Sequence, residues 1–105
     1  MDQGLDAVAF RSDNPFELEL SKNLTFLQSL KKEVTVFMSN HKTLPIKDRV
    51  LAIQKIQRDF KTIQSFIEKS KSEEINNSGI KFRLEGLKNS LISLQVLWAK
   101  MEKTL

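Results

Sequence analysis

Apolar residues recur every three or four positions in three long segments of this 105-residue chain, and two polar breaks separate the segments. This spacing matches the helical repeat of about 3.6 residues, so each segment should form an amphipathic α-helix with one buried stripe. A lone amphipathic helix needs a partner chain, but three of similar length can bury one another. The sequence therefore predicts an all-α fold, an up-down-up antiparallel three-helix bundle with a short N-terminal leader.

The first helix is expected at about residues 15–40. Asn14 can cap it, Pro15 suits the first helical position, and Glu17 can complete a capping box. Its stripe comprises Phe16, Leu20, Leu24, Leu27, Leu30, Val34 and Phe37 or Met38.

The second helix is expected at about residues 45–70, after the polar segment SNHKTLP, because Pro45 disfavours α geometry at Leu44. Its stripe comprises Ile46, Val50, Ile53, Ile56, Phe60, Ile63 and Ile67.

The third helix is expected at about residues 78–105, after the polar segment KSEEINNSG. Asn76, Asn77 and Ser78 favour side-chain bonds to nearby backbone, and Gly79 is costly inside a helix. Its stripe comprises Ile80, Leu84, Leu87, Leu91, Leu94, Trp98, Met101 and Leu105.

Residues 14–105 should thus form one bundle, and residues 1–13 an acidic leader that is either flexible or a partner-binding peptide. The net charge is +4, which at this size favours a solvated lysine-rich surface over a nucleic-acid site. There is no cysteine, no apolar run approaches the ~20 residues of a membrane span, and the N-terminus lacks the basic start of a signal peptide. These features predict a cytoplasmic location.

No residue pattern suggests catalysis. His41 is the only histidine and has no cysteine or second histidine to work with. Glu73 and Glu74 are adjacent, so on a helix their side chains would diverge, and the glycines do not form a phosphate-binding loop. We therefore expect no enzymatic activity, no metal and no cofactor.

The chain has more apolar residues than one core requires. On the expected helices several lie off the main stripes, including Leu51 and Phe66. Some could simply flank a wide core, and others could form a partner-binding surface on the outer faces of the first and third helices. The candidates for that surface are Leu18, Phe26, Val36, Phe82, Ile92 and Val96.

A second candidate surface is electrostatic. Up-down-up topology brings the first turn and the end of the third helix together, which gathers Lys42, Lys47, Arg49, Lys100 and Lys103 at one end, hereafter the basic pole. The helix macrodipole stabilises cations near a helix C-terminus, so Lys100 and Lys103 could simply form a solvated cap. The alternative is a site for acidic partners or anionic headgroups.

The order of segments also resembles a known family. An Asn-Pro-Phe helix start, the run AIQKIQRDFKTIQSFI, the polar break SEEIN and the run FRLEGLKNSLISLQ are similar to the N-terminal three-helix domains of small Q-SNAREs, of the membrin type or the unconventional SNARE of the endoplasmic reticulum. The resemblance spans roughly residues 14–105 and rests on pattern and length.

This resemblance implies an Habc-like regulatory domain in ER/Golgi vesicle trafficking that binds subunits of a tethering complex or SNARE-associated factors. It implies a location on the cytosolic face of the ER or Golgi, with membrane association only through a segment absent from this chain. We expect a monomeric domain, with an elongated dimer as the structural alternative.

A second resemblance leads to another class of protein. Arg83, Gly86 and Leu87 resemble the Arg-x-x-Gly-Leu run in the last helix of BAG-type co-chaperones, but Leu91 stands where that family has a polar residue. The alternative function is therefore a soluble helical adaptor, a co-chaperone or a structural subunit of a multiprotein complex.

Overall fold

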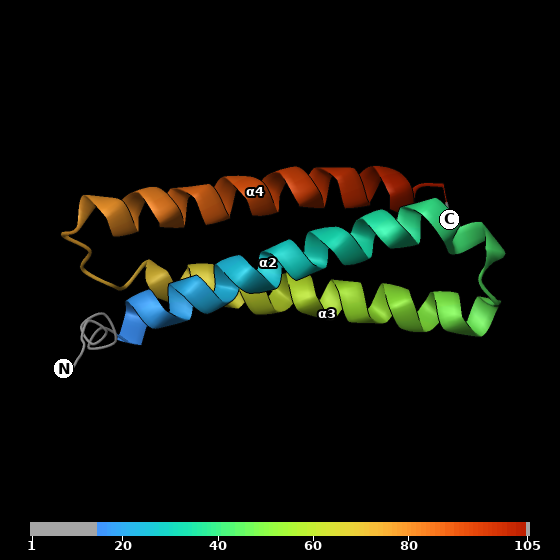
Figure 1. Ribbon diagram of the computed structural model, residues 1–105, viewed down its shortest axis with the longest axis horizontal. Coiled ribbons are helices and arrows are strands. Elements are labelled where there is room, and N and C mark those ends of the chain that lie inside the picture. The colour runs from blue at the N-terminus through green and yellow to red at the C-terminus, as the bar shows by residue number, and fades with distance from the viewer. Residues whose placement is uncertain (1–14, 105) are drawn as a thin grey trace, which may run out of the picture.

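The computed structural model describes residues 15–104 and is an antiparallel three-helix bundle (Figure 1). Its long helices are α2 (Pro15–Asn40), α3 (Ile46–Ser70) and α4 (Ser78–Glu102), and a short 3₁₀ helix, η1 (His41–Thr43), joins α2 to α3. This confirms the predicted fold class. The helix bounds match the expected ones except that α3 begins at Ile46 and α4 ends at Glu102. Asn14 and the acidic leader lie outside the described residues.

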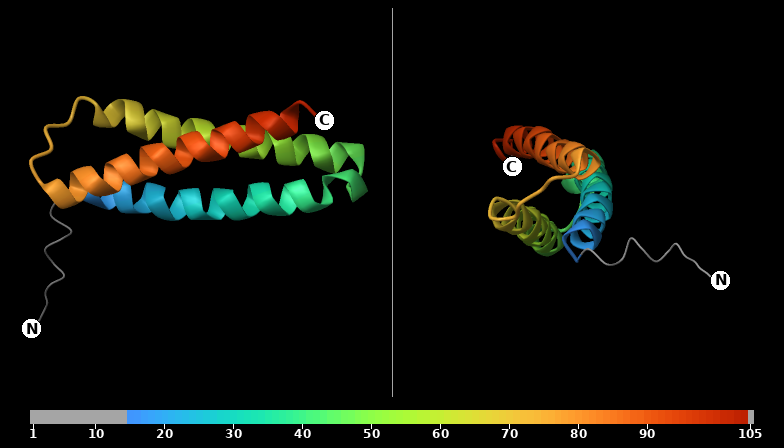
Figure 2. Two further views of the ribbon diagram at one scale, coloured as in Figure 1. Left: turned by 90° about the horizontal axis from the view of Figure 1, so that it is seen from above. Right: turned by 90° about the vertical axis from the view of Figure 1, so that its left-hand side faces the viewer.

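The molecule is elongated, measuring 53 × 29 × 16 Å. The helices run side by side, so the two ends of the bundle are built from helix termini and turns (Figure 2). Cross-helix ion pairs tie α2 to both neighbours: Lys69 and Glu19 join it to α3, and Arg83 and Glu17 join it to α4. No helix within residues 15–104 is long and apolar enough to cross a membrane.

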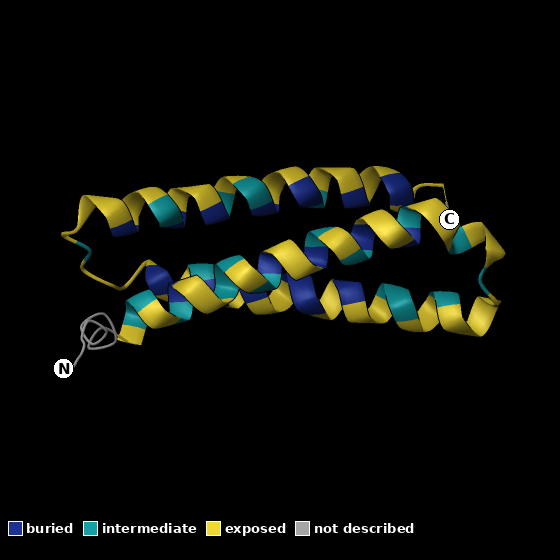
Figure 3. Cartoon of the chain, viewed as in Figure 1, coloured by how far each residue is buried: buried dark blue, intermediate teal, exposed yellow. Residues whose placement is uncertain are grey.

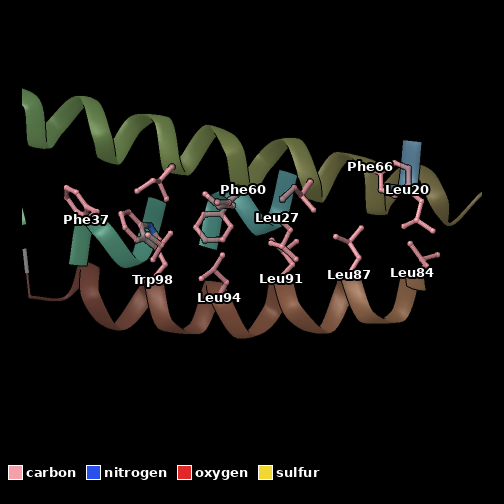
Figure 4. Packing of buried hydrophobic residues seen from close by; sticks show 14 of the residues in the cluster. Leu20, Leu27, Phe37, Phe60, Phe66, Leu84, Leu87, Leu91, Leu94 and Trp98 are labelled. Carbon is pink, nitrogen blue, oxygen red and sulfur yellow. The ribbon is translucent and has the colours of Figure 1, made fainter. Parts of the chain in front are cut away.

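The predicted stripes meet in one continuous core (Figure 3). Leucines dominate its middle, and Trp98 lies near Phe37 and Phe60 toward one end, with ring centroids 5.8 and 6.4 Å away (Figure 4). Burial of such side chains from all three helices is what stabilises the bundle. The buried apolar residues are Leu20, Leu27, Leu30, Val34, Phe37, Ile56, Phe60, Ile63, Phe66, Ile80, Leu84, Leu87, Leu91, Leu94, Trp98 and Met101.

The prediction was wrong at the start of α3. Ile46 and Val50 were placed in the buried stripe but are 74% and 46% exposed. Gln57 Nε2 donates a hydrogen bond of 2.9 Å to a carboxylate oxygen of Glu102, so the last residue of α4 lies level with the start of the fourth turn of α3. The first turns of α3 therefore extend beyond the end of α4 (Figure 1), which leaves Ile46 and Val50 exposed.

The opposite error occurred at Phe66, which was placed off the main face but is buried. Its ring stacks on Phe16 of α2, with centroids 5.4 Å apart and planes inclined by 21°. The buried arc of α3 is wide at this end, because the next residue, Ile67, about 100° further round the helix, also packs against the core.

The start of α4 follows from its capping residue. Asn77 has extended backbone geometry, and its side-chain Oδ1 accepts a hydrogen bond of 3.1 Å from the backbone N–H of Ile80. This is the local bonding expected of asparagine in the break. A Cβ atom on Gly79 would lie 3.1 Å from that same Oδ1, so glycine leaves room for the cap.

Candidate partner-binding surfaces

The predicted apolar anchors on α2 do not form one patch. Leu18 and Val36 are 49% and 57% exposed, but they lie five helical turns apart along one side of α2, roughly 27 Å. Phe26 is partly buried and packs against the core, so it flanks the core and does not project from the surface.

The predicted anchors on α4 are all exposed. Ile92 and Val96 lie one turn apart, so their side chains are neighbours on the helix surface. Phe82, the most exposed of them at 80%, lies about 15 Å from Ile92 along the helix. The predicted anchors on this helix therefore form one apolar pair and one ring that is separate from that pair.

A predominantly apolar hollow lies between α2 and α3. It has a volume of about 410 Å³, and Phe37, Leu44, Ala52 and Ile56 line it together with the predicted anchor Val36. Lys32, Glu33, Asn40 and Lys55 complete its lining. A groove of this composition, apolar with charged groups around it, suits the apolar side chains of a partner helix.

An ion-pair network fixes one rim of this α2/α3 groove. Lys55 Nζ lies 2.6 Å from Glu33 across the helix pair and 3.0 Å from Asp59 one turn further along α3. The hydrogen bond to Glu33, and to a lesser extent the one to Asp59, raises the pKa of Lys55 above its usual value of 10.5, because these bonds favour the charged ammonium. Lys32, by contrast, is exposed and forms no ion pair with any residue in the described range.

Sequence reasoning found Val36 but missed the rest of the groove. Leu44 follows η1 and precedes Pro45, a position with no helical periodicity to mark it. Ala52 contributes by being small, since a larger side chain facing α2 would fill the hollow. The sequence shows only that Ala52 is a small residue in a helix otherwise rich in larger ones.

The residues of the basic pole lie on η1, at the start of α3 and at the end of α4. Lys42 and Lys100 line one hollow between η1 and the end of α4, together with His41 and Met101, with a volume of about 580 Å³. Lys47 and Arg49 come from the first turn of α3, where the guanidinium of Arg49 donates a hydrogen bond of 3.0 Å to the carbonyl of Leu44. Lys103 directly follows α4.

Residues 15–104 contain no cluster of three or more histidine, cysteine or carboxylate side chains that could hold a metal ion. His41 packs its ring on Phe37, with centroids 5.5 Å apart, and its Nδ1 donates a hydrogen bond of 3.2 Å to the carbonyl of that residue. Glu73 and Glu74 are exposed in the turn before α4. His41, Glu73 and Glu74 therefore do not converge on one place where they could act on a common substrate.

The residues that resemble the co-chaperone run are mostly engaged in the fold. The guanidinium of Arg83 lies 2.7 Å from Glu17, and Leu87 is fully buried. Leu91 is buried as well, so the residues of this run that follow Arg83 on the same face of α4 belong to the core. Only Gly86 is exposed, where an added Cβ would meet nothing within 4 Å.

Comparison of the chain with protein-family models, with curated protein sequences and with solved structures finds no match.

Proposed function

We propose that this chain is a non-enzymatic protein–protein interaction domain, namely the regulatory N-terminal domain of a SNARE in ER/Golgi vesicle trafficking, which binds a tethering complex or another trafficking factor. The observation that carries the proposal is the apolar α2/α3 groove, with Val36 exposed at its edge. The order of segments that resembles small Q-SNAREs supports the trafficking context, and that resemblance implies a bundle of this kind.

The groove also suggests the chemistry of the partner. Its lining is apolar at Val36, Leu44 and Ala52, so the partner should insert one or two apolar side chains from a helix. Lys32 is an ammonium without an ion pair in residues 15–104 beside that apolar lining, so a carboxylate next to the inserted side chain would complement it.

The experiment compares two variants with the same chemical change. Val36→Asp places a charge at the groove, whereas Val96→Asp places it on the outer face of α4, at a valine of similar exposure, 51% against 57%. Each purified full chain is immobilised and exposed to a detergent extract of ER and Golgi membranes, and bound proteins are quantified by mass spectrometry. Circular dichroism checks that both variants are folded.

We expect tethering-complex subunits or SNARE-associated proteins to be enriched on the wild type and on Val96→Asp, and lost on Val36→Asp. Loss on Val96→Asp alone would move the site to α4. Enrichment of a chaperone instead of trafficking factors would contradict the proposal and favour the co-chaperone alternative.

A further inference from the structure

The basic pole carries cations that the fold leaves without partners. Its segments, 41–50 and 98–104, contain five lysines and arginines against two carboxylates, Asp48 and Glu102. Glu102 accepts a hydrogen bond from Gln57. Among the described residues, no ion pair or hydrogen bond engages the ammonium groups of Lys42, Lys47, Lys100 and Lys103.

The helix macrodipole accounts for only part of this cluster. Lys100 and Lys103 lie at the C-terminal end of α4, where the dipole favours positive charge. Lys47 and Arg49 lie in the first turn of α3, at the positive end of that helix, where the dipole opposes them. The guanidinium of Arg49 is held by the carbonyl of Leu44, so Lys47 is the cation that needs another explanation.

Exposed apolar side chains stand among the cations. Ile46 directly precedes Lys47 and is 74% exposed, and Val50, one turn later, is 46% exposed. Both belong to the first turns of α3, which extend beyond the end of α4 (Figure 1). An exposed isoleucine next to a lysine combines the two kinds of side chain, apolar and basic, that amphipathic segments use to bind membrane surfaces.

We propose that the basic pole docks the bundle, end on, onto an anionic lipid bilayer. Lys47 meets the negative surface beside Ile46 and Val50, which enter the headgroup layer, and Lys42 and Lys100, set further back around a shared hollow, add to the electrostatic attraction. The cations are spread over three segments around a protruding tip, which suits an extended charged surface. An acidic peptide would be better held by a groove with cations along its length.

This inference goes beyond the proposed function, because the resemblance places membrane association only in a segment absent from this chain. It also rests on residues outside the α2/α3 groove. Val36→Asp should abolish partner capture and leave lipid binding intact, so the two proposals can fail separately.

The test measures co-sedimentation of the full chain with vesicles of phosphatidylcholine alone or mixed with phosphatidylserine. The charge variant is Lys42→Glu combined with Lys47→Glu, and the apolar variant is Ile46→Ser. The matched control is Lys22→Glu combined with Lys81→Glu, which makes the same change in net charge near the opposite end. All these positions are exposed, and circular dichroism verifies the fold.

We expect the wild type to bind only vesicles that contain phosphatidylserine, and to bind less as salt is raised above about 0.15 M. Lys42→Glu with Lys47→Glu should weaken partitioning by about 25-fold or more, since one lysine near an anionic surface contributes about fivefold. Ile46→Ser should weaken it severalfold, and the control should change it by less than about threefold.

Three results would overturn the proposal. The first is no binding of the wild type to phosphatidylserine vesicles at low salt. The second is an equal loss in the control variant, which would show an effect of net charge alone. The third is binding of a polyglutamate peptide, sensitive to Lys42→Glu with Lys47→Glu, without binding to vesicles, which would assign the pole to an acidic protein.

Discussion

The two ends of the bundle use their charges in opposite ways. At the end where α2 and α4 begin, which we call the ion-paired end, Glu17 pairs with Arg83 at 2.7 Å and Glu19 pairs with Lys69 at 3.2 Å. These contacts join different helices. At the basic pole, the lysines reach no carboxylate in the described residues, and α3 extends past its neighbour.

The difference separates two roles for charged residues in one small fold. A cation whose charge is matched across a helix interface helps to hold that interface and is less available to a second molecule. A cation on a free side chain contributes little to stability and keeps its full capacity to attract anions. We therefore expect charge-removing variants at the ion-paired end to alter stability, and charge-removing variants at the basic pole to alter binding.

The largest effect tests the core that both ends share. Leu91→Asp would bury an unpaired charge at the centre of α4, where Leu91 is 3% exposed. We expect it to cost about 4 kcal/mol or more and to unfold the domain, which removes the distinction between the ends. The next residue provides the control, because Ile92→Asp at an exposed position should leave the thermal midpoint nearly unchanged. Similar melting curves for the two variants would refute the helix register.

The second test compares the aromatic packing at the two ends. Phe66→Ala removes the ring stacked on Phe16 at the ion-paired end, and Trp98→Ala removes the ring near Phe37 and Phe60 at the other. Each should lower the free energy of unfolding by about 3 to 5 kcal/mol in urea titrations. A loss below about 1 kcal/mol for either variant would mean that its end of the core is loosely packed.

The third test isolates the charges. Arg83→Met keeps an aliphatic stem but removes the pair with Glu17, and it should cost about 0.5 to 1 kcal/mol, less at high salt. Lys42→Met, the same change at the basic pole, should cost close to nothing. Thermal midpoints at low and high salt would measure both, and a larger loss for Lys42→Met would reverse the comparison.

The smallest effect concerns Lys55, between the two ends. Because hydrogen bonds to Glu33 and Asp59 raise the pKa of Lys55 in the fold, its stabilisation is fully present below pH 10.5 and is lost as the pH rises through the higher folded value. Lys55→Met should thus lower the thermal midpoint slightly at pH 8 and have no effect well above pH 10.5. Lys61→Met, at an exposed lysine without an ion pair in residues 15–104, provides the control.

The fold could be predicted because local sequence signals mark each helix. Periodic leucines and isoleucines define the buried faces, Pro45 precedes α3, and Asn77 caps α4. Short connections leave little choice but antiparallel neighbours. None of this information depends on contacts between distant parts of the chain.

The errors occurred where distant parts of the chain decide the outcome. Whether Ile46 is buried depends on where α4 ends beside α3, and periodicity carries no information about that offset. Phe66 is buried because Phe16 of another helix meets it. The α2/α3 groove exists because Ala52 is small at a position that faces α2, which becomes visible only once the helices are packed.

Trp98 is the only tryptophan in the chain, and it is buried among aromatic rings in the half of the bundle that ends at the basic pole. The molecule therefore carries one intrinsic fluorophore. Its emission reports the local environment of that half, so a spectral shift or a change in quenching on addition of vesicles or a partner would register events there without any chemical label.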